Sequence, residues 1–128
     1  MQTSFIHLRV SSEFSISRGL LRINEIVDNA KKLKMPAVAL SDLNNMFGMV
    51  KFFKKAEAEG IKPIAGTILN LRSHSEELGE ILCLAKNNDG LKSLMSIISK
   101  SQFHQENGLI SITFDELKSC AGNIVVIA

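Results

Sequence analysis

One stretch of this chain, residues 36–53, constrains the fold more than any other. It begins with a short apolar run at residues 37–40, of the kind found in buried strands. A polar turn is expected at residues 41–45, and apolar residues at helical spacing follow it. Asp42 therefore lies just beyond a buried strand and before a helix, where α/β proteins carry their functional side chains. The stretch predicts an α/β fold with its site at this end of the sheet.

Strands and helices alternate along the rest of the chain, which predicts βαβ units and a largely parallel sheet. Strands are indicated by alternation or by apolar runs, and helices by apolar residues three and four apart. The expected strands are residues 5–10, 37–40, 64–71, 80–85, 109–112 and 124–128. The expected helices are residues 20–33, 46–59 and 91–98 and a short one after residue 113, with a loop at 101–108.

Local signals predict where several helices begin and end. Asn24 is an expected N-cap of the first helix, and Pro36 ends it because the residue before proline avoids the helical region. Gly60 is expected to end the second helix, since glycine adopts the left-handed conformation easily. Thr113 and Glu116 have the spacing of a capping box, in which side chain and backbone bond reciprocally.

The expected helix at residues 46–59 is amphipathic. Its lysines are interleaved with Glu57 and Glu59, which favours a solvated face over a DNA-binding track. The apolar stripe is expected to pack into the core rather than to form a groove for a partner. Its members are Met46, Met49, Val50, Phe53 and Ala56.

Composition narrows the class of protein. The chain has 128 residues, 45% of them hydrophobic, so it is one domain or part of one and can form a packed core. A net charge of +2 gives no argument for nucleic acid or membrane binding. No apolar run reaches the length of a membrane span, and the first residues lack a secretion signal. We expect a cytoplasmic protein without membrane contact, in which Cys83 and Cys120 are buried thiols.

Four segments, in order, resemble the polymerase-and-histidinol-phosphatase (PHP) domain family. They are residues 7–15, 41–48, 60–66 and 84–94. Within them, Asn-Met-Phe-Gly at 45–48 and Gly-Ile-Lys-Pro-Ile at 60–64 resemble the PHP domains that begin bacterial DNA polymerase III alpha subunits. The resemblance implies a distorted (β/α)7 barrel. Residues 1–128 would be its truncated N-terminal portion, with the barrel continuing beyond residue 128.

Active members of this family bind a metal cluster through histidines and carboxylates at the carboxyl ends of strands, and the cluster activates water for phosphoester hydrolysis. The corresponding positions here are His7, Arg9, Ser11, Asp42, Leu43 and Ile68. Two of them, His7 and Asp42, keep side chains able to ligate, whereas Arg9 is always protonated. We therefore expect a vestigial site with no metal and no catalytic residue, in which Arg9 forms an ion pair with Asp42.

The resemblance implies two alternative functions. In the first, the segment is a scaffold and a docking surface for the proofreading exonuclease (epsilon) subunit. Its full-length parent would be a DNA-directed DNA polymerase that contacts DNA and uses Mg²⁺ elsewhere in the chain. In the second, the domain is an active metal-dependent phosphoesterase or 3'-5' exonuclease with a reduced ligand set: His7, Asp42 and ligands beyond Ala128. In either case, an open parallel edge predicts marginal stability or self-association of the isolated segment.

Overall fold

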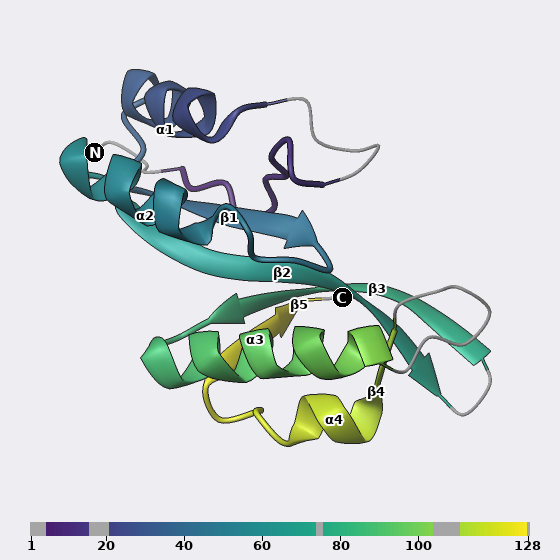
Figure 1. Cartoon of the computed structure of the whole chain (residues 1–128). Helices are drawn as coiled ribbons and strands as arrows, with labels where there is room; N and C mark the ends of the chain where they lie inside the picture. The colour runs from purple at the N-terminus through teal and green to yellow at the C-terminus, as the bar shows by residue number, and fades with distance from the viewer. Residues whose placement is uncertain (1–4, 16–20, 74–75, 104–110, 128) are drawn as a thin grey trace.

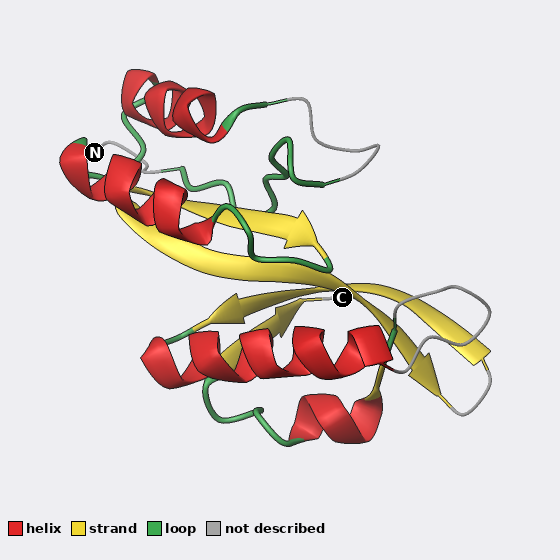
Figure 2. Cartoon of the chain, viewed as in Figure 1, coloured by secondary structure: helices red, strands yellow, loops and turns green. Residues whose placement is uncertain are grey.

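The structure, a computed structural model, describes residues 5–15, 21–73, 76–103 and 111–127. Helices alternate with strands, apart from two strands that follow each other directly, and the strands form one twisted sheet (Figures 1 and 2). The elements are α1 (Ile23–Lys32), β1 (Ala37–Leu43), α2 (Met49–Ala58), β2 (Lys62–Ser73), β3 (Glu76–Ala85), α3 (Asn88–Phe103), β4 (Ile112–Thr113), α4 (Phe114–Lys118) and β5 (Ile124–Ile127). The α/β class is confirmed.

The strands of the sheet follow the order β1-β2-β3-β5, and β4 pairs with the far end of β2. β1 and β4 are parallel to β2, whereas β3 is antiparallel to both β2 and β5. The four strands β1, β2, β4 and β5 therefore run in one direction and β3 in the other. The reversal follows from the short β2–β3 connection, because parallel neighbours need a crossover of a dozen residues or more.

The helices pack on one face of the sheet. Ala65 and Leu69 are four residues apart on β2, so they share that face. Ala65 belongs to a core cluster with residues of α1 and α2, and Leu69 to a cluster with residues of α3 and α4. Figure 1 shows α1 and α2 beside β1 and β2, with α3 and α4 beside β3 and β5. This arrangement is consistent with part of a barrel whose helices lie outside.

The opposite face of the sheet carries a third apolar cluster, here called the inner cluster. Its buried members come from three strands, and partly buried side chains pack against them. The buried members are Ala39, Ile68, Leu82 and Leu84; the partly buried ones are Leu8, Leu43 and Ile64. The inner cluster fills the space that would be the interior of a barrel.

The strand expected at residues 5–10 is wrong. The segment runs beside β1, where Ala39 N–H donates to His7 O at 3.0 Å and Ser41 N–H to Val10 O at 2.8 Å. Two residues of β1 are thus matched by three of the segment, which breaks a regular ladder. Val10 N–H donates to the Ser41 hydroxyl at 3.0 Å instead of to a carbonyl. Apolar and polar residues do alternate in this segment, but a hydrogen bond to the Ser41 side chain replaces one of the backbone bonds that a strand would form.

Two of the predicted helix signals are confirmed and one is wrong. Gly60 adopts φ 72° after α2, and Thr113 forms the reciprocal capping box with Glu116. The N-cap of α1 is Arg22, not Asn24, and no side chain caps it. Asn24 lies one residue inside the helix, because Ile23 already has helical geometry.

The polar residues after the first apolar run belong to β1 and not to a turn. β1 continues through Ser41 and Asp42 to Leu43, and the chain turns at Asn44, whose φ is 54°. The predicted turn at residues 41–45 is therefore wrong for its first three residues. Their backbone pairs with β2, and this pairing holds polar residues in extended geometry.

The buried face of α2 differs from the predicted stripe. The helix begins at Met49, and Met49, Phe52 and Ala56 are buried. Val50 is 69% exposed, and Phe53 is partly buried. Positions 49, 52 and 56 have the same three–four spacing as the predicted set, so periodicity alone could not choose between them.

The two cysteines are buried free thiols, as predicted. Burial raises the pKa of Cys83 to about 12 and also raises the pKa of Cys120. Residues 101–103 belong to α3 instead of the expected loop. The described residues do not include the rest of that loop, residues 109–110 of the expected strand, or Leu20 of the expected first helix. Among the described helices, none is long and apolar enough to cross a membrane.

Candidate functional site

Asp42 is the buried acid at the carboxyl end of β1. Its side chain is 1% exposed and accepts three hydrogen bonds of 2.6 Å each. The donors are the Ser12 backbone N–H, the Ser12 hydroxyl and the Ser15 hydroxyl. We call Ser12 and Ser15 the serine cage. Charge-assisted hydrogen bonds to a carboxylate are the strong ones, so the cage stabilises the buried carboxylate without a cation.

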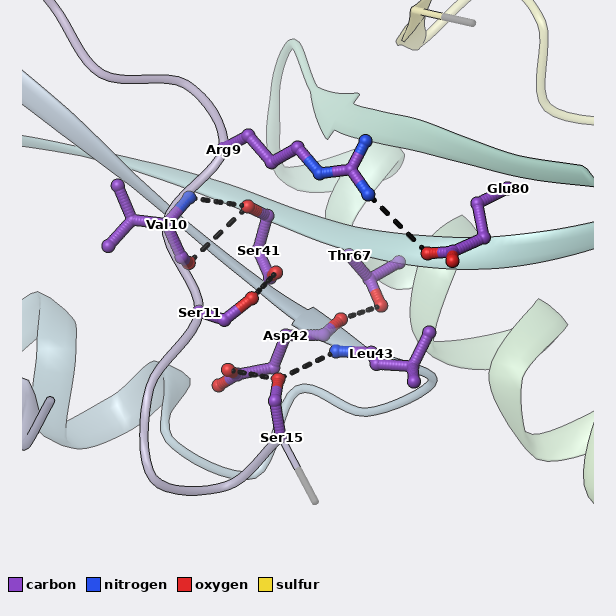
Figure 3. Close-up of polar contacts among 9 residues, drawn as sticks. All are labelled: Arg9, Val10, Ser11, Ser15, Ser41, Asp42, Leu43, Thr67 and Glu80. Atoms are coloured by element: carbon purple, nitrogen blue, oxygen red, sulfur yellow. Dashed lines mark hydrogen bonds and ion pairs between the residues drawn. The ribbon is translucent and has the colours of Figure 1, made fainter. Parts of the chain in front are cut away.

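Further hydrogen bonds connect the serine cage to β1 and connect β1 to β2. The Ser15 hydroxyl also accepts from Leu43 N–H at 2.9 Å, and the Thr67 hydroxyl donates to the Asp42 carbonyl at 2.8 Å (Figure 3). Asn45 donates through its amide to Phe14 O and Leu43 O. The loop before α1 is thus fixed over the end of β1 by side chains from both segments.

The predicted ion pair between Arg9 and Asp42 is wrong. The Arg9 guanidinium lies 3.4 Å from the Glu80 carboxylate on β3, and its side chain is 54% exposed. Figure 3 shows Arg9 extended toward Glu80 and away from Asp42. The segment that carries Arg9 is not a regular strand, so the guanidinium is not aimed at the end of β1. The serine cage, and not an arginine, partners the buried acid.

Two of the positions at which the family resemblance implies metal ligands are filled by packed apolar side chains. Leu43 and Ile68 are register partners on β1 and β2. Ile68 is 1% exposed in the inner cluster, and Leu43 packs against that cluster. Ser11 lies nearby, where its hydroxyl donates to the Ser41 carbonyl at 3.4 Å. At these positions the chain offers methyl groups and a bonded hydroxyl in place of imidazole and carboxylate.

His7 lies toward the other end of β1. Its carbonyl accepts from Ala39 N–H, three residues before Asp42, a separation of roughly 10 Å along a strand. Its exposed ring packs edge-on against Phe5, with the ring centroids 4.7 Å apart. It also lines an apolar groove with α1 residues that include Ile26 and Ala30. The structure therefore does not join His7 and Asp42 into one ligand set.

These residues do not fit the metal cluster that the family resemblance implies. Such a cluster needs several N and O ligands converging from different strands. In the part of the chain that the structure describes, no three His, Cys, Asp or Glu side chains come together to hold a metal ion. The Asp42 oxygens already accept three hydrogen bonds, so a metal would have to displace the serine cage.

Sequence reasoning missed the residues that partner the site. No sequence pattern identified Ser12, Ser15 or Thr67 as partners of Asp42, or Glu80 as the partner of Arg9. The available signal was three hydroxyl side chains within five residues, Ser11, Ser12 and Ser15, because hydroxyls readily donate to a buried acid. The other two histidines, His74 and His104, lie outside the described residues.

The chain is similar to a known family and to a group of much longer proteins. Residues 7–127 match the family profile described as "PHP domain". DNA polymerase III subunit alpha of Pseudomonas aeruginosa is 39% identical over 131 aligned residues, which cover 100% of this chain and 11% of that protein. The Escherichia coli subunit is 40% identical over 99 residues, covering 76% and 8%. The chain thus spans about a tenth of the length of these curated relatives.

Solved structures show the same fold at low sequence identity. A proposed metal-dependent phosphoesterase from Bifidobacterium adolescentis matches with a TM-score of 0.60 and 16% identity, covering 79% of this chain and 34% of that one. An amidohydrolase from Chromobacterium violaceum, solved with sulfate and no metal, matches with a TM-score of 0.56 and 23% identity, covering 72% and 32%. At these identities the likeness concerns the fold alone.

Proposed function

Because the chain belongs to the PHP domain family, we propose that it is the N-terminal PHP segment of a replicative DNA polymerase III alpha subunit. The 39% identity over the whole chain to a small part of such a subunit supports this assignment. In this proposal the barrel continues beyond residue 128. The complete protein carries out DNA-directed DNA synthesis in the cytoplasm, contacting DNA and using Mg²⁺ in other parts of its chain.

We propose further that this domain works without a metal. The observation that carries the proposal is the serine cage, because it leaves Asp42 fully hydrogen-bonded with no cation. The apolar pair Leu43 and Ile68 supports it, since two positions that would supply ligands are packed into the inner cluster. No residue of the segment is assigned a catalytic role.

A domain without phosphoesterase chemistry can still contribute a rigid surface. We propose that it is a scaffold and the docking surface for the proofreading exonuclease subunit. The buried polar network between the loop before α1 and the end of β1 supports a fixed scaffold, because fully satisfied buried networks rigidify the structure around them.

Metal analysis of the purified full-length alpha subunit, here called the complete chain, tests the proposal that the PHP domain holds no metal. After dialysis against metal-free buffer and re-addition of Zn²⁺ or Mn²⁺, we expect a stoichiometry near zero at the PHP domain. A stoichiometry near one or above, lost in Asp42→Ala, would instead support the alternative of an active phosphoesterase or exonuclease with a reduced ligand set. A pull-down with the exonuclease subunit tests the docking role, which fails if the complete chain does not retain that subunit.

A further inference from the structure

A shallow groove on the outer surface combines apolar and cationic side chains. It has a volume of about 590 Å³ and lies between the start of α1 and one face of α2. Its lining residues are Asn24, Phe47, Val50, Lys51, Lys54 and Lys55. Neither the core of the domain nor the serine cage explains this combination.

Two large apolar side chains in the groove are exposed to water. Phe47 is 74% exposed and Val50 is 69% exposed, the two highest values among the large apolar side chains described. Phe47 lies just before the N-cap residue Gly48 and Val50 lies in the first turn of α2, and both side chains line the groove. By contrast, Met49 and Phe52 of the same helix are buried. Phe47 and Val50 thus form a small apolar surface without a core partner.

The charges in the groove are only partly compensated. Lys55 lies 3.2 Å from Asp28 and 3.3 Å from Glu59, and these carboxylates raise its pKa, with the Asp28 hydrogen bond contributing most. Lys51 and Lys54 form no ion pair with any residue in the described part of the chain. Two uncompensated positive charges therefore lie next to the apolar pair.

We propose that the face formed by Phe47, Val50, Lys51 and Lys54, here called the α2 face, binds a segment of a partner protein that carries an apolar side chain beside carboxylates. The apolar side chain covers Phe47 and Val50, while the carboxylates pair with the two free lysines. The inference rests on the proposed docking role. It adds which surface binds the partner and what kind of partner segment that surface accepts.

A protein segment fits this face better than a nucleic acid does. Affinity for a phosphate backbone grows with the number of cations that neutralise phosphates, and only two lysines of the groove lack a carboxylate partner within the described chain. Lys55, the third lysine of the groove, is already paired with Asp28 and Glu59. An aromatic and an aliphatic side chain next to two cations match a short acidic segment with an apolar anchor.

The test measures binding of the purified exonuclease subunit to the complete chain by surface plasmon resonance at low and high salt. Lys51→Glu with Lys54→Glu should weaken binding at least about tenfold, because each attraction between a lysine and a partner carboxylate becomes a repulsion between two carboxylates. Phe47→Ala should weaken it about fivefold or more, as expected for a central apolar contact. The matched control, Lys92→Glu with Lys100→Glu on α3, reverses two other exposed lysines and should leave binding unchanged.

The outcomes separate the surface from the docking role. If the wild-type chain binds and the Lys51/Lys54 reversal binds equally well, the α2 face is overturned while the docking role stands. If the wild-type chain does not bind, the docking role itself fails, and the α2 face with it. If the reversal abolishes binding of a thymidine 20-mer but leaves exonuclease binding intact, the face binds nucleic acid and the proposal is wrong. Lys51→Gln with Lys54→Gln serves in place of the reversal if the latter lowers the melting temperature.

Discussion

Asp42 and Leu43 are adjacent in β1 but lie in opposite environments. Asp42 accepts three hydrogen bonds from the serine cage, whereas Leu43 packs with Ile68 against the inner cluster. Successive residues of a strand point to opposite faces, so both environments occur at one strand end. One region keeps an acid and satisfies it with hydroxyls; the other has apolar groups at ligand positions. The proposed absence of a metal at this strand end would thus have two different physical reasons.

The largest effect is expected from putting a carboxylate into the apolar region. Ile68→Glu places an acid where the native side chain is 1% exposed between its cross-strand partners Leu43 and Leu82. We expect a loss of about 4 kcal/mol or more in unfolding free energy, because the buried charge has no partner. Urea unfolding measures it, and the control is Ile127→Glu, at a position of β5 that is 40% exposed.

Added metal sharpens this first prediction. Zn²⁺ or Mn²⁺ should not restore the stability of Ile68→Glu, since no three His, Cys, Asp or Glu side chains come together among the described residues. By contrast, Arg9→His, Ser11→His and Leu43→His combined with Ile68→Glu are expected to allow metal binding, measured as metal content after dialysis. Recovery of stability with metal in the single variant would show that the apolar region still forms a site.

The second effect comes from removing the acid of the polar region. Asp42→Ala leaves the Ser12 amide and the hydroxyls of Ser12 and Ser15 buried without their acceptor. We expect a loss of about 3 kcal/mol, since each unsatisfied buried group carries a desolvation penalty. The control is Asp89→Ala, an exposed acid in the first turn of α3. Equal unfolding free energies for the two variants would mean that the serine cage contributes nothing.

The third prediction separates the two serines. Ser15→Ala removes one donor to Asp42 and also the acceptor of Leu43 N–H, so a loss of about 1–2 kcal/mol is expected. Ser12→Ala keeps the backbone bond to Asp42 but removes the hydroxyl that donates to Asp42 and accepts from Phe14 N–H at 3.2 Å, so a similar loss is expected. Hydrogen exchange provides the specific readout: the Leu43 amide should exchange faster in Ser15→Ala than in Ser12→Ala. Equal exchange rates would rule out the Ser15–Leu43 bond.

The smallest effect is expected at Arg9. Its pair with Glu80 is 3.4 Å long and joins side chains that are 54% and 27% exposed. Arg9→Ala should therefore cost less than about 1 kcal/mol, as is usual for exposed ion pairs, and the cost should shrink in high salt. Unfolding at two salt concentrations checks this. A salt-independent loss as large as that of Asp42→Ala would mean that Arg9 partners the buried acid after all.

Much of the local structure could be predicted from the sequence because local chemistry determines it. The apolar run of β1, the left-handed Gly60 after α2 and the capping box at Thr113 each depend on residues within a few positions. The departures from the metal-ligand pattern at Arg9, Leu43 and Ile68 are equally visible, since residue identity alone shows what cannot ligate. These features required no knowledge of the tertiary structure.

The buried face of α2 and the path of residues 5–10 were not predictable in the same way. Two stripes with helical spacing compete in α2, and packing against the sheet selects the one that contains Phe52. The segment at 5–10 alternates like a strand, yet the Ser41 hydroxyl takes the Val10 N–H and interrupts the ladder. In both cases the sequence pattern allows two local structures, and contacts with a distant part of the chain determine which one forms.

The sequence by itself determined that Asp42 closely follows a buried apolar run, and that several positions at which the family resemblance implies metal ligands carry other residues. Only the tertiary structure decided what the buried acid bonds to. Ser12 and Ser15 lie about thirty residues away in sequence, and a few ångströms decide whether a hydroxyl or a guanidinium reaches the carboxylate. That distance depends on how the loop before α1 folds over β1, which residue identity and spacing do not specify.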